Sequence, residues 1–163
     1  SYKASAGHPF PATKKQMLNI INKLLGTGKY EKIFLVTEEE NYKNFLINKF
    51  GNKIIYIPSS FRSDSNDAFK VYPRKNHRYR LGEEILIEAM LLSKCDGLTF
   101  IKSNVISAAI NFSKKKIRLH EIFLGHNSRN RLIAGWLWYL KKHLPKNLYG
   151  LKMDASLVQV IYH

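Results

Sequence analysis

Residues 80–107 read RLGEEILIEAMLLSKCDGLTFIKSNVIS, and this stretch decides the fold class. Its first part, from about Leu81 to Cys95, is apolar almost all round, which is typical of a buried helix. Gly97 to Lys102 is rich in strand-forming residues, and a second helix is expected to begin at Ser103. This order of helix, strand and helix predicts a parallel sheet covered by helices.

The same alternation continues on both sides of this stretch. Apolar residues at helical spacing after Thr13 predict an amphipathic helix over Lys14 to Leu25. The other expected elements are a strand at Lys32–Thr37, a helix at Glu40–Phe50, a strand at Lys53–Ile57, a polar loop at Ser59–Arg80, a strand near Lys116–Leu124 and a helix at Arg131–Leu144. Right-handed crossovers then predict a doubly wound, mostly parallel α/β sheet of about four or five strands. Leu157 to Tyr162 is interpreted either as an edge strand or as a segment docked on a partner domain.

Composition predicts one globular domain over residues 1–163 with a negatively charged partner. The chain has 163 residues, 45% of them hydrophobic, and 27 Lys and Arg against 12 Asp and Glu, a net charge of +15. Such a charge attracts phosphates, nucleotides, nucleic acid or an anionic membrane surface. The chain has one cysteine, Cys95, which rules out an internal disulfide and is interpreted as a packed thiol. The six histidines show no metal-binding spacing, so we expect no metal.

The chain is expected to be cytoplasmic and to be a fragment of a longer protein. No apolar run approaches the roughly 18 residues that span a bilayer, and Ser1 to Phe10 lacks the layout of a signal peptide. The sequence begins without methionine, in a stretch of small residues that starts no recognisable element.

Ligands of doubly wound sheets bind beyond the carboxyl ends of the strands, so the residues that follow each strand are candidates. Ser103, Asn104 and Val105 follow one strand after Lys102 and open a helix, whose backbone N–H groups can bind phosphate. Ser103 can equally be a simple helix cap.

Thr37 and Glu38 follow another strand, within a run of three glutamates. They are suited to sugar hydroxyls, or else they form an ordinary acidic first turn.

Two further features leave alternatives open. Glu88 interrupts the apolar helix, so it is either a buried carboxylate with a donor or part of a solvated stripe with Glu84, four residues earlier. The loop after Phe61 carries many cationic side chains, which suit phosphate contact or a solvated loop: Arg62, Arg74, Lys75, His77, Arg78 and Arg80. In the helix after Arg131, apolar positions at helical spacing describe a core face more simply than a membrane-facing one: Leu132, Ile133, Trp136, Leu137 and Leu140.

The stretch at residues 80–107 resembles the donor-binding segment of GDP-fucose-dependent fucosyltransferases, the group of nodulation protein Z and the core α1,6-fucosyltransferases. Ile33 to Glu38 resembles the family's strand that ends in a Thr-Asp pair. His120 to Arg131 is similar to the segment that closes the family's catalytic domain, through Phe123, Gly125, His126, Asn127 and Asn130.

The resemblance implies the Rossmann-like, C-terminal half of a bacterial GT-B glycosyltransferase that binds GDP-fucose or a similar GDP-sugar without a metal. In this resemblance Glu88 occupies the position of an aspartate that pairs with guanine in the family. Ser103 and Asn104 occupy the positions at which the family binds the diphosphate. The expected donor site is completed by Val105, Thr37, Glu38 and Arg62, and the catalytic residues are not identified.

The implied partners are a glycan acceptor and an N-terminal domain absent from this sequence, whose His-x-Arg motif would precede Ser1. The fragment alone is expected to be inactive. Peripheral contact with the inner membrane is also expected, and nucleic acid is disfavoured. A basic α/β module for nucleic acid or anionic membrane is the alternative.

Overall fold

A computed structural model of the chain describes residues 7–64, 68, 71–144, 148 and 158–162. The chain divides into two compact units, each assembled from separate segments. The first unit contains Tyr30–Cys95 and Asn104–Lys115. The second contains Tyr2–Lys29, Asp96–Ser103 and Lys116–His163. Both mix helices with parallel strand pairs, which confirms the α/β class.

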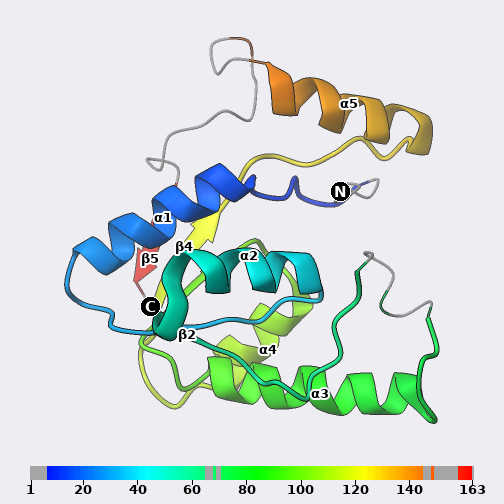
Figure 1. The fold of residues 1–163 in the computed structure, drawn as a ribbon. Coiled ribbons are helices and arrows are strands. Elements are labelled where there is room, and N and C mark those ends of the chain that lie inside the picture. The colour runs from blue at the N-terminus through cyan, green and yellow to red at the C-terminus, as the bar shows by residue number, and fades with distance from the viewer. Residues whose placement is uncertain (1–6, 65–67, 69–70, 145–147, 149–157, 163) are drawn as a thin grey trace. The chain divides into compact units, whose positions relative to one another are not determined.

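The first unit is built on one parallel strand pair (Figure 1). Its elements are β1 (Ile33–Phe34), α2 (Glu40–Phe50), the 3₁₀ turn η1 (Gly51–Lys53), β2 (Ile54–Ile55), α3 (His77–Leu92) and α4 (Asn104–Phe112). Gly51 ends α2 with φ 53°, a backbone angle that glycine adopts without steric cost. The helices α3 and α4 pack against each other.

The second unit contains a three-stranded sheet in the order β3-β4-β5. Its elements are α1 (Lys14–Gly26), β3 (Gly97–Phe100), β4 (Arg118–Ile122), α5 (Arg131–His143) and β5 (Val158–Tyr162). β3 pairs parallel with β4, whereas β5 pairs antiparallel with β4 at the edge of the sheet. The edge-strand interpretation of the C-terminal segment is therefore confirmed.

The core of the second unit forms around an aromatic side chain near the N-terminus. Phe10 is fully buried, packs with Ile20, Ile122 and Leu124, and stacks on Trp138 with ring centroids 5.8 Å apart. The Thr13 hydroxyl accepts a hydrogen bond from the Gln16 N–H at 3.2 Å, and the Gln16 side chain accepts one from the Thr13 N–H at 2.8 Å. This capping box explains why α1 begins where the sequence predicts.

Several expected elements differ in extent from those observed. The strands of the described residues form a two-stranded and a three-stranded sheet, in place of one sheet of four or five strands. β1 and β2 each contain only two residues, which is shorter than the strands expected at Lys32–Thr37 and Lys53–Ile57. The helix α3 begins at His77 within the predicted loop, four residues before the expected start, because the polar first turn hides it from an apolar periodicity search.

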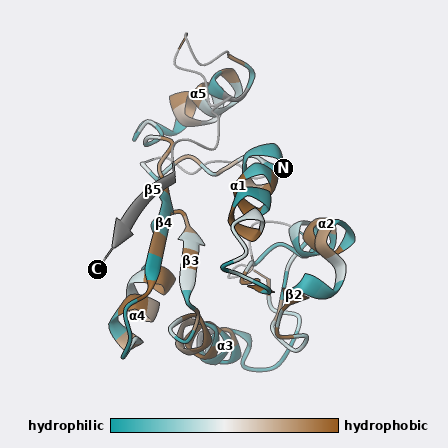
Figure 2. Cartoon of the chain, turned by 90° about the vertical axis from the view of Figure 1, so that its left-hand side faces the viewer, coloured by the Kyte–Doolittle hydropathy of each residue, from teal (hydrophilic) through white to brown (hydrophobic). Residues whose placement is uncertain are grey.

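The predicted core face of α5 is wrong at most of its positions. Leu132 is 89% exposed and Trp136 is 71% exposed, and Ile133 and Leu140 are also exposed. Of the predicted residues only Leu137 packs against the core, and Ala134 and Trp138, on a different side of the helix, complete the contact. Hydrophobic residues occur on both sides of α5, as the brown segments of this helix in Figure 2 indicate, so periodicity alone did not identify the packed side.

Candidate functional site

The candidate site lies in the first unit, where the chain leaves β1 and β2. The Ser63 N–H donates to the Glu38 carbonyl at 2.8 Å, and the Glu40 N–H donates to the Ser63 carbonyl at 3.1 Å. The two segments therefore continue side by side beyond the carboxyl ends of their strands. The Thr37 hydroxyl accepts from the Glu39 N–H at 3.2 Å, which fixes the turn into α2.

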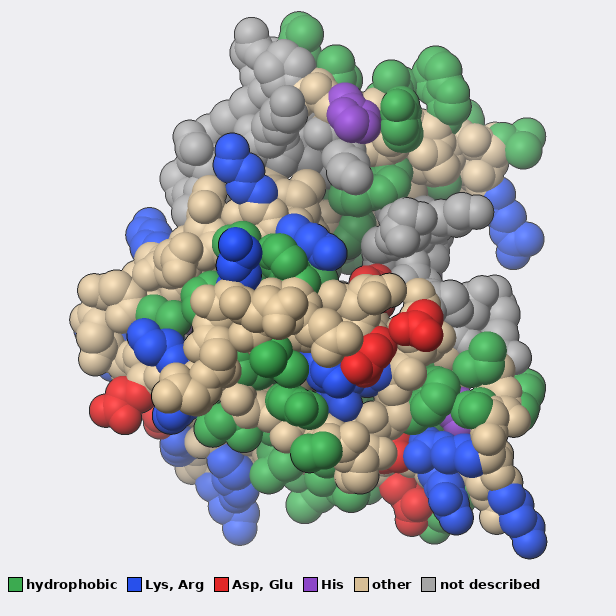
Figure 3. Space-filling model, viewed as in Figure 1, with side chains coloured by type: hydrophobic (Ala, Val, Ile, Leu, Met, Phe, Trp, Pro, Cys, Tyr) green, Lys and Arg blue, Asp and Glu red, His purple; other side chains and the backbone are tan. Residues whose placement is uncertain are grey.

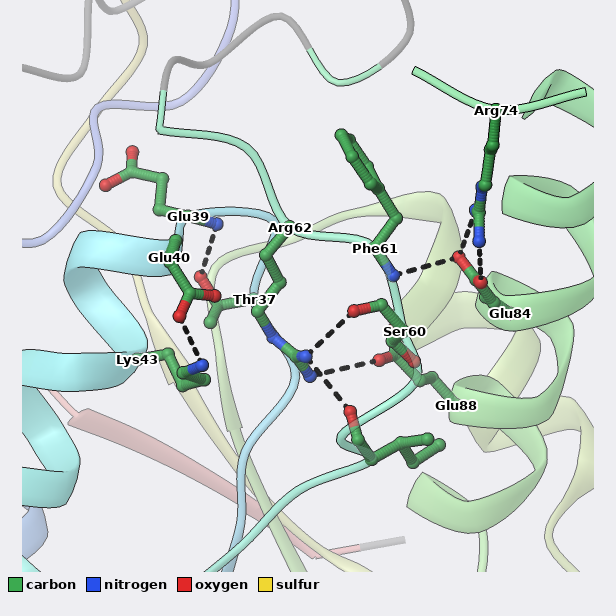
Figure 4. Close-up of polar contacts among 11 residues, drawn as sticks. Thr37, Glu39, Glu40, Lys43, Ser60, Phe61, Arg62, Arg74, Glu84 and Glu88 are labelled. Carbon is green, nitrogen blue, oxygen red and sulfur yellow. Dashed lines mark hydrogen bonds and ion pairs between the residues drawn. The ribbon is translucent and has the colours of Figure 1, made fainter. Parts of the chain in front are cut away.

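Arg62 is the buried cation of this site. Its side chain is 2% exposed, and its Nη1 atom donates to the carbonyls of Ile57 and Ser60, both at 3.0 Å. Figure 4 shows the guanidinium directed toward Ser60 and Glu88. Within the part of the chain that the structure describes, its Nε and Nη2 atoms and the Ser60 hydroxyl are buried without a hydrogen-bond partner. Buried donors of this kind are costly, so the cluster has unused capacity to bind an acceptor.

Glu88 approaches Arg62 from α3. The residue is 8% exposed, and its Oε1 atom lies 3.8 Å from the Arg62 Nη2 atom, which makes an ion pair without a hydrogen bond. Burial raises the pKa of Glu88 above its ordinary value, and the nearby Ser60 and Arg62 offset this only in part. The Ser60 Oγ atom does not reach standard hydrogen-bond geometry, so Ser60 is a neighbour of the carboxylate and not an established donor to it. The solvated-stripe interpretation of Glu88 is wrong.

A second acid–base pair holds the same loop one turn earlier on α3. Both Nη atoms of Arg74 donate to the Glu84 carboxylate, at 2.6 and 2.8 Å, and the Phe61 N–H donates to the same carboxylate at 3.1 Å. The hydrogen bonds from Arg74 are the largest cause of a lowered pKa at Glu84. Glu84 is therefore a structural anchor, which the sequence interpretation as a solvated residue missed.

His77 extends this anchor into the interior. Its side chain is almost fully buried, with Nδ1 3.2 Å from the Arg74 Nε atom and Nε2 2.9 Å from the Ala68 carbonyl oxygen. Because Arg74 can only donate, Nδ1 accepts and Nε2 carries the proton that is donated to Ala68. Arg74 and His77, expected as phosphate ligands or solvated residues, instead fix the loop to α3.

The acidic run after β1 contributes residues with different environments. Glu38 is exposed as a residue, yet desolvation of its carboxyl, followed by repulsion from Glu39, raises its pKa. Its charge also contributes to the raised pKa of Glu88, and this effect is smaller than that of Glu84. Glu40 forms an ion pair with Lys43 on α2, and this contact is the largest cause of its lowered pKa. Three of the twelve acidic residues of the chain thus interact with Arg62 or Arg74: Glu40, Glu84 and Glu88.

The structure brings together some of the predicted site residues. Arg62, Glu88 and Glu38 interact, and Thr37 adjoins them in the same strand-end segment. Asn104 and Val105 open α4, which packs on α3, so they belong to the same unit as Glu88. Ser103 is exposed and precedes α4 in the chain, but it belongs to the second unit. The predicted juxtaposition of Ser103 with Glu88 stays a prediction.

The residues of the segment His120–Arg131 that sequence analysis singled out have structural roles in the second unit. The buried Asn127 side chain donates to the Ala134 carbonyl at 3.0 Å and accepts from the Ser128 N–H at 2.9 Å. The Asn130 side chain accepts from the Leu132 N–H at 2.9 Å and caps α5. Gly125 adopts φ 85° beside Phe10, a conformation that favours glycine.

Comparison with family models, with curated proteins and with solved structures found no match for this chain. Within the described ranges, no group of three or more His, Cys, Asp and Glu side chains is arranged to hold a metal ion. The helices of these ranges are also too short or too polar for any of them to cross a membrane.

Proposed function

We propose that this chain is the donor-binding part of a glycosyltransferase that transfers fucose, or a similar sugar, from a GDP-sugar to a glycan hydroxyl. One observation supports this most: a buried carboxylate, Glu88, lies beside buried and unused N–H donors of Arg62, next to the carboxyl ends of two parallel strands. This location is where α/β sheets bind nucleotides. The finer fold assignment, a Rossmann-like half of a GT-B enzyme, is part of the proposal.

The chemistry of the cluster suits a guanine edge. Guanine presents two adjacent N–H donors, at N1 and N2, which one carboxylate can accept in parallel, and beside them the O6 acceptor. In this assignment Glu88 accepts from N1–H and N2–H, and the Arg62 guanidinium donates toward O6. The Ser60 backbone carbonyl accepts a hydrogen bond from Arg62 and so helps to hold the guanidinium beside Glu88.

The remaining parts of the donor are assigned by chemistry. Asn104 and Val105 are the first residues of α4, where the helix dipole favours the diphosphate, with Ser103 just before them. Thr37 and Glu38 are assigned to hydroxyl groups of the ribose or the sugar. Transfer would also require an acceptor-side domain, so we expect the 163-residue chain by itself to bind the donor without turnover. The whole enzyme would act in the cytoplasm, at the inner membrane where bacterial surface glycans are built.

Calorimetric titration of the 163-residue chain with GDP and IDP tests the base assignment. IDP lacks the exocyclic amino group at C2, so the wild type should bind GDP more tightly than IDP, by about tenfold for one lost hydrogen bond to a charged acceptor. In Glu88→Gln this preference should disappear, because the amide no longer accepts two hydrogen bonds. Binding of inorganic diphosphate should be unchanged by the substitution.

Glu31→Gln is the matched control, because Glu31 is an exposed glutamate of the same unit and the substitution removes the same charge. This variant should retain the GDP preference. Equal affinities of the wild type for GDP and IDP, or equal losses of GDP and diphosphate affinity in Glu88→Gln, would contradict the assigned role of Glu88.

The rival function, a basic module for nucleic acid or anionic membrane, depends on the net charge of +15. On the face shown in Figure 3, Lys and Arg side chains occur singly and in small groups, without the continuous stripe that tracks a phosphate backbone. Tight, salt-sensitive binding of duplex DNA together with no response to GDP would favour this rival.

A further inference from the structure

The helix α3 has an apolar side that the first unit does not use. The buried side of α3 consists of Leu81, Glu88, Ala89 and Leu92. On the opposite side of the helix, four large apolar side chains are between 42% and 52% exposed. These four are Leu86, Ile87, Met90 and Leu91. Figure 1 shows α3 running along the edge of the first unit. We call the four residues the α3 stripe.

Two charged residues of opposite sign lie at the ends of this stripe. Glu83 precedes it and Lys94 follows α3, and both are exposed. At 100° per residue, Glu83 and the stripe fall within an arc of about 140° on one side of the helix axis, and Lys94 comes directly after the C-cap residue Ser93, whose backbone is still right-handed helical. The nearby Glu83 carboxylate raises the pKa of Tyr79, and the neutral tyrosine hydroxyl does not compensate the charge of Glu83.

The order of these six residues is self-complementary. In two antiparallel copies of α3 related by a two-fold axis near position 88, Glu83 of one copy faces Lys94 of the other. In the same register, Leu86 faces Leu91 and Ile87 faces Met90, and every pairing occurs twice by symmetry. A surface that matches itself in both hydropathy and charge is the requirement for an isologous dimer.

We propose that the α3 stripe is the interface of a homodimer in which two copies of α3 pack antiparallel. A second copy of this chain is the occupant that the order of the residues favours, because the stripe and the charges of opposite sign at its two ends are complementary to themselves. The stripe and its two flanking charges together cover only about 16 Å along the helix, at 1.5 Å per residue, so the dimer is weak and concentration-dependent. This proposal does not depend on the proposed function.

Sedimentation velocity of the 163-residue chain over the micromolar to millimolar range measures this association. The wild type should shift from monomer to dimer within the range, and Met90→Glu should remain monomeric. Because Met90 is half exposed, its substitution leaves the buried side of α3 intact. A wild type that stays monomeric throughout would overturn the proposal and leave the stripe to a different partner.

Charge reversal tests the antiparallel register specifically. Lys94→Glu places two glutamates opposite each other, and Glu83→Lys places two lysines opposite each other, so each variant should dimerise about tenfold more weakly or worse. Mixing the two variants should restore association, because every facing pair is then Glu with Lys. The double variant carrying both substitutions should also dimerise like the wild type.

Lys49→Glu is the control for the change in net charge, because Lys49 is an exposed lysine in the last turn of α2. It should dimerise normally. Failure of both the mixture and the double variant to recover, while each folds as judged by circular dichroism, would overturn the antiparallel register.

Discussion

The Glu88 Oε1 atom lies 3.8 Å from the Nη2 atom of Arg62, and both side chains are almost fully buried. One turn earlier on the same helix, Glu84 makes a bidentate contact with Arg74 at 2.6 and 2.8 Å. The Glu84 carboxylate is therefore hydrogen-bonded to its arginine, whereas the Glu88 carboxylate forms an ion pair without a hydrogen bond. The pKa of Glu84 is lowered by its partner, whereas burial raises the pKa of Glu88 despite its partner.

Replacing Glu88 by glutamine should stabilise the chain at neutral pH. A carboxyl whose pKa is raised on folding is less favourable when ionised in the folded state than in the unfolded state, and a neutral amide removes that cost. As the pH falls through the raised pKa of Glu88, the wild-type carboxyl becomes protonated and the advantage of the variant should shrink. Thermal unfolding from neutral to mildly acidic pH measures both effects. Equal stability of Glu88→Gln and the wild type at neutral pH would contradict the buried, poorly compensated carboxylate.

Replacing Glu84 by glutamine should have the opposite sign. The lowered pKa of Glu84 means that its ionised form stabilises the fold above the usual carboxyl pKa of 4.5, and that this stability is lost as the pH falls further. At neutral pH the variant should lose about 2 kcal/mol, the scale of a charged hydrogen-bond pair that is partly buried. Denaturant titrations at neutral and acidic pH check the loss and its disappearance in acid. Glu31→Gln, at an exposed position, should leave both curves unchanged.

The contrast between the two glutamates explains how far the sequence predicts the site. The i, i+4 spacing places Glu84 and Glu88 on one side of a helix, and an apolar run around them predicts that this helix is buried. The spacing does not indicate which cation each carboxylate meets. Arg74 lies 10 residues from Glu84, and Arg62 lies 26 residues from Glu88, so both contacts depend on the path of a polar loop without periodicity.

Similar physics explains the parts of the fold that could be predicted. Local signals fix helix ends: Thr13 with Gln16 starts α1, and Gly51 stops α2. The pairing of strands and the packed side of a helix depend on distant residues. Trp138 packs because Phe10 lies against it, whereas Trp136, two positions earlier, meets no such partner and is exposed.

The capping box of α1 should contribute measurably to stability. Thr13→Ala removes the acceptor of the Gln16 N–H, and Gln16→Ala removes the acceptor of the Thr13 N–H. Each should cost about 1 kcal/mol, and the double variant should cost less than the sum because the two bonds support each other. Chemical unfolding of the two single variants and the double variant forms the cycle. Strict additivity would show that the reciprocal bonds act independently.

The two tryptophans of the chain should report opposite environments. Trp138 stacks on the buried Phe10, so Trp138→Ala should cost about 3 kcal/mol, whereas Trp136→Ala should stay within about 0.5 kcal/mol. Fluorescence separates the sites because each Trp→Phe variant leaves one indole. Trp136→Phe should emit at shorter wavelength and resist quenching by acrylamide, since the remaining indole is partly buried. Trp138→Phe should emit at longer wavelength and be quenched readily. The reverse assignment would mean that α5 packs through the Leu132 and Trp136 side.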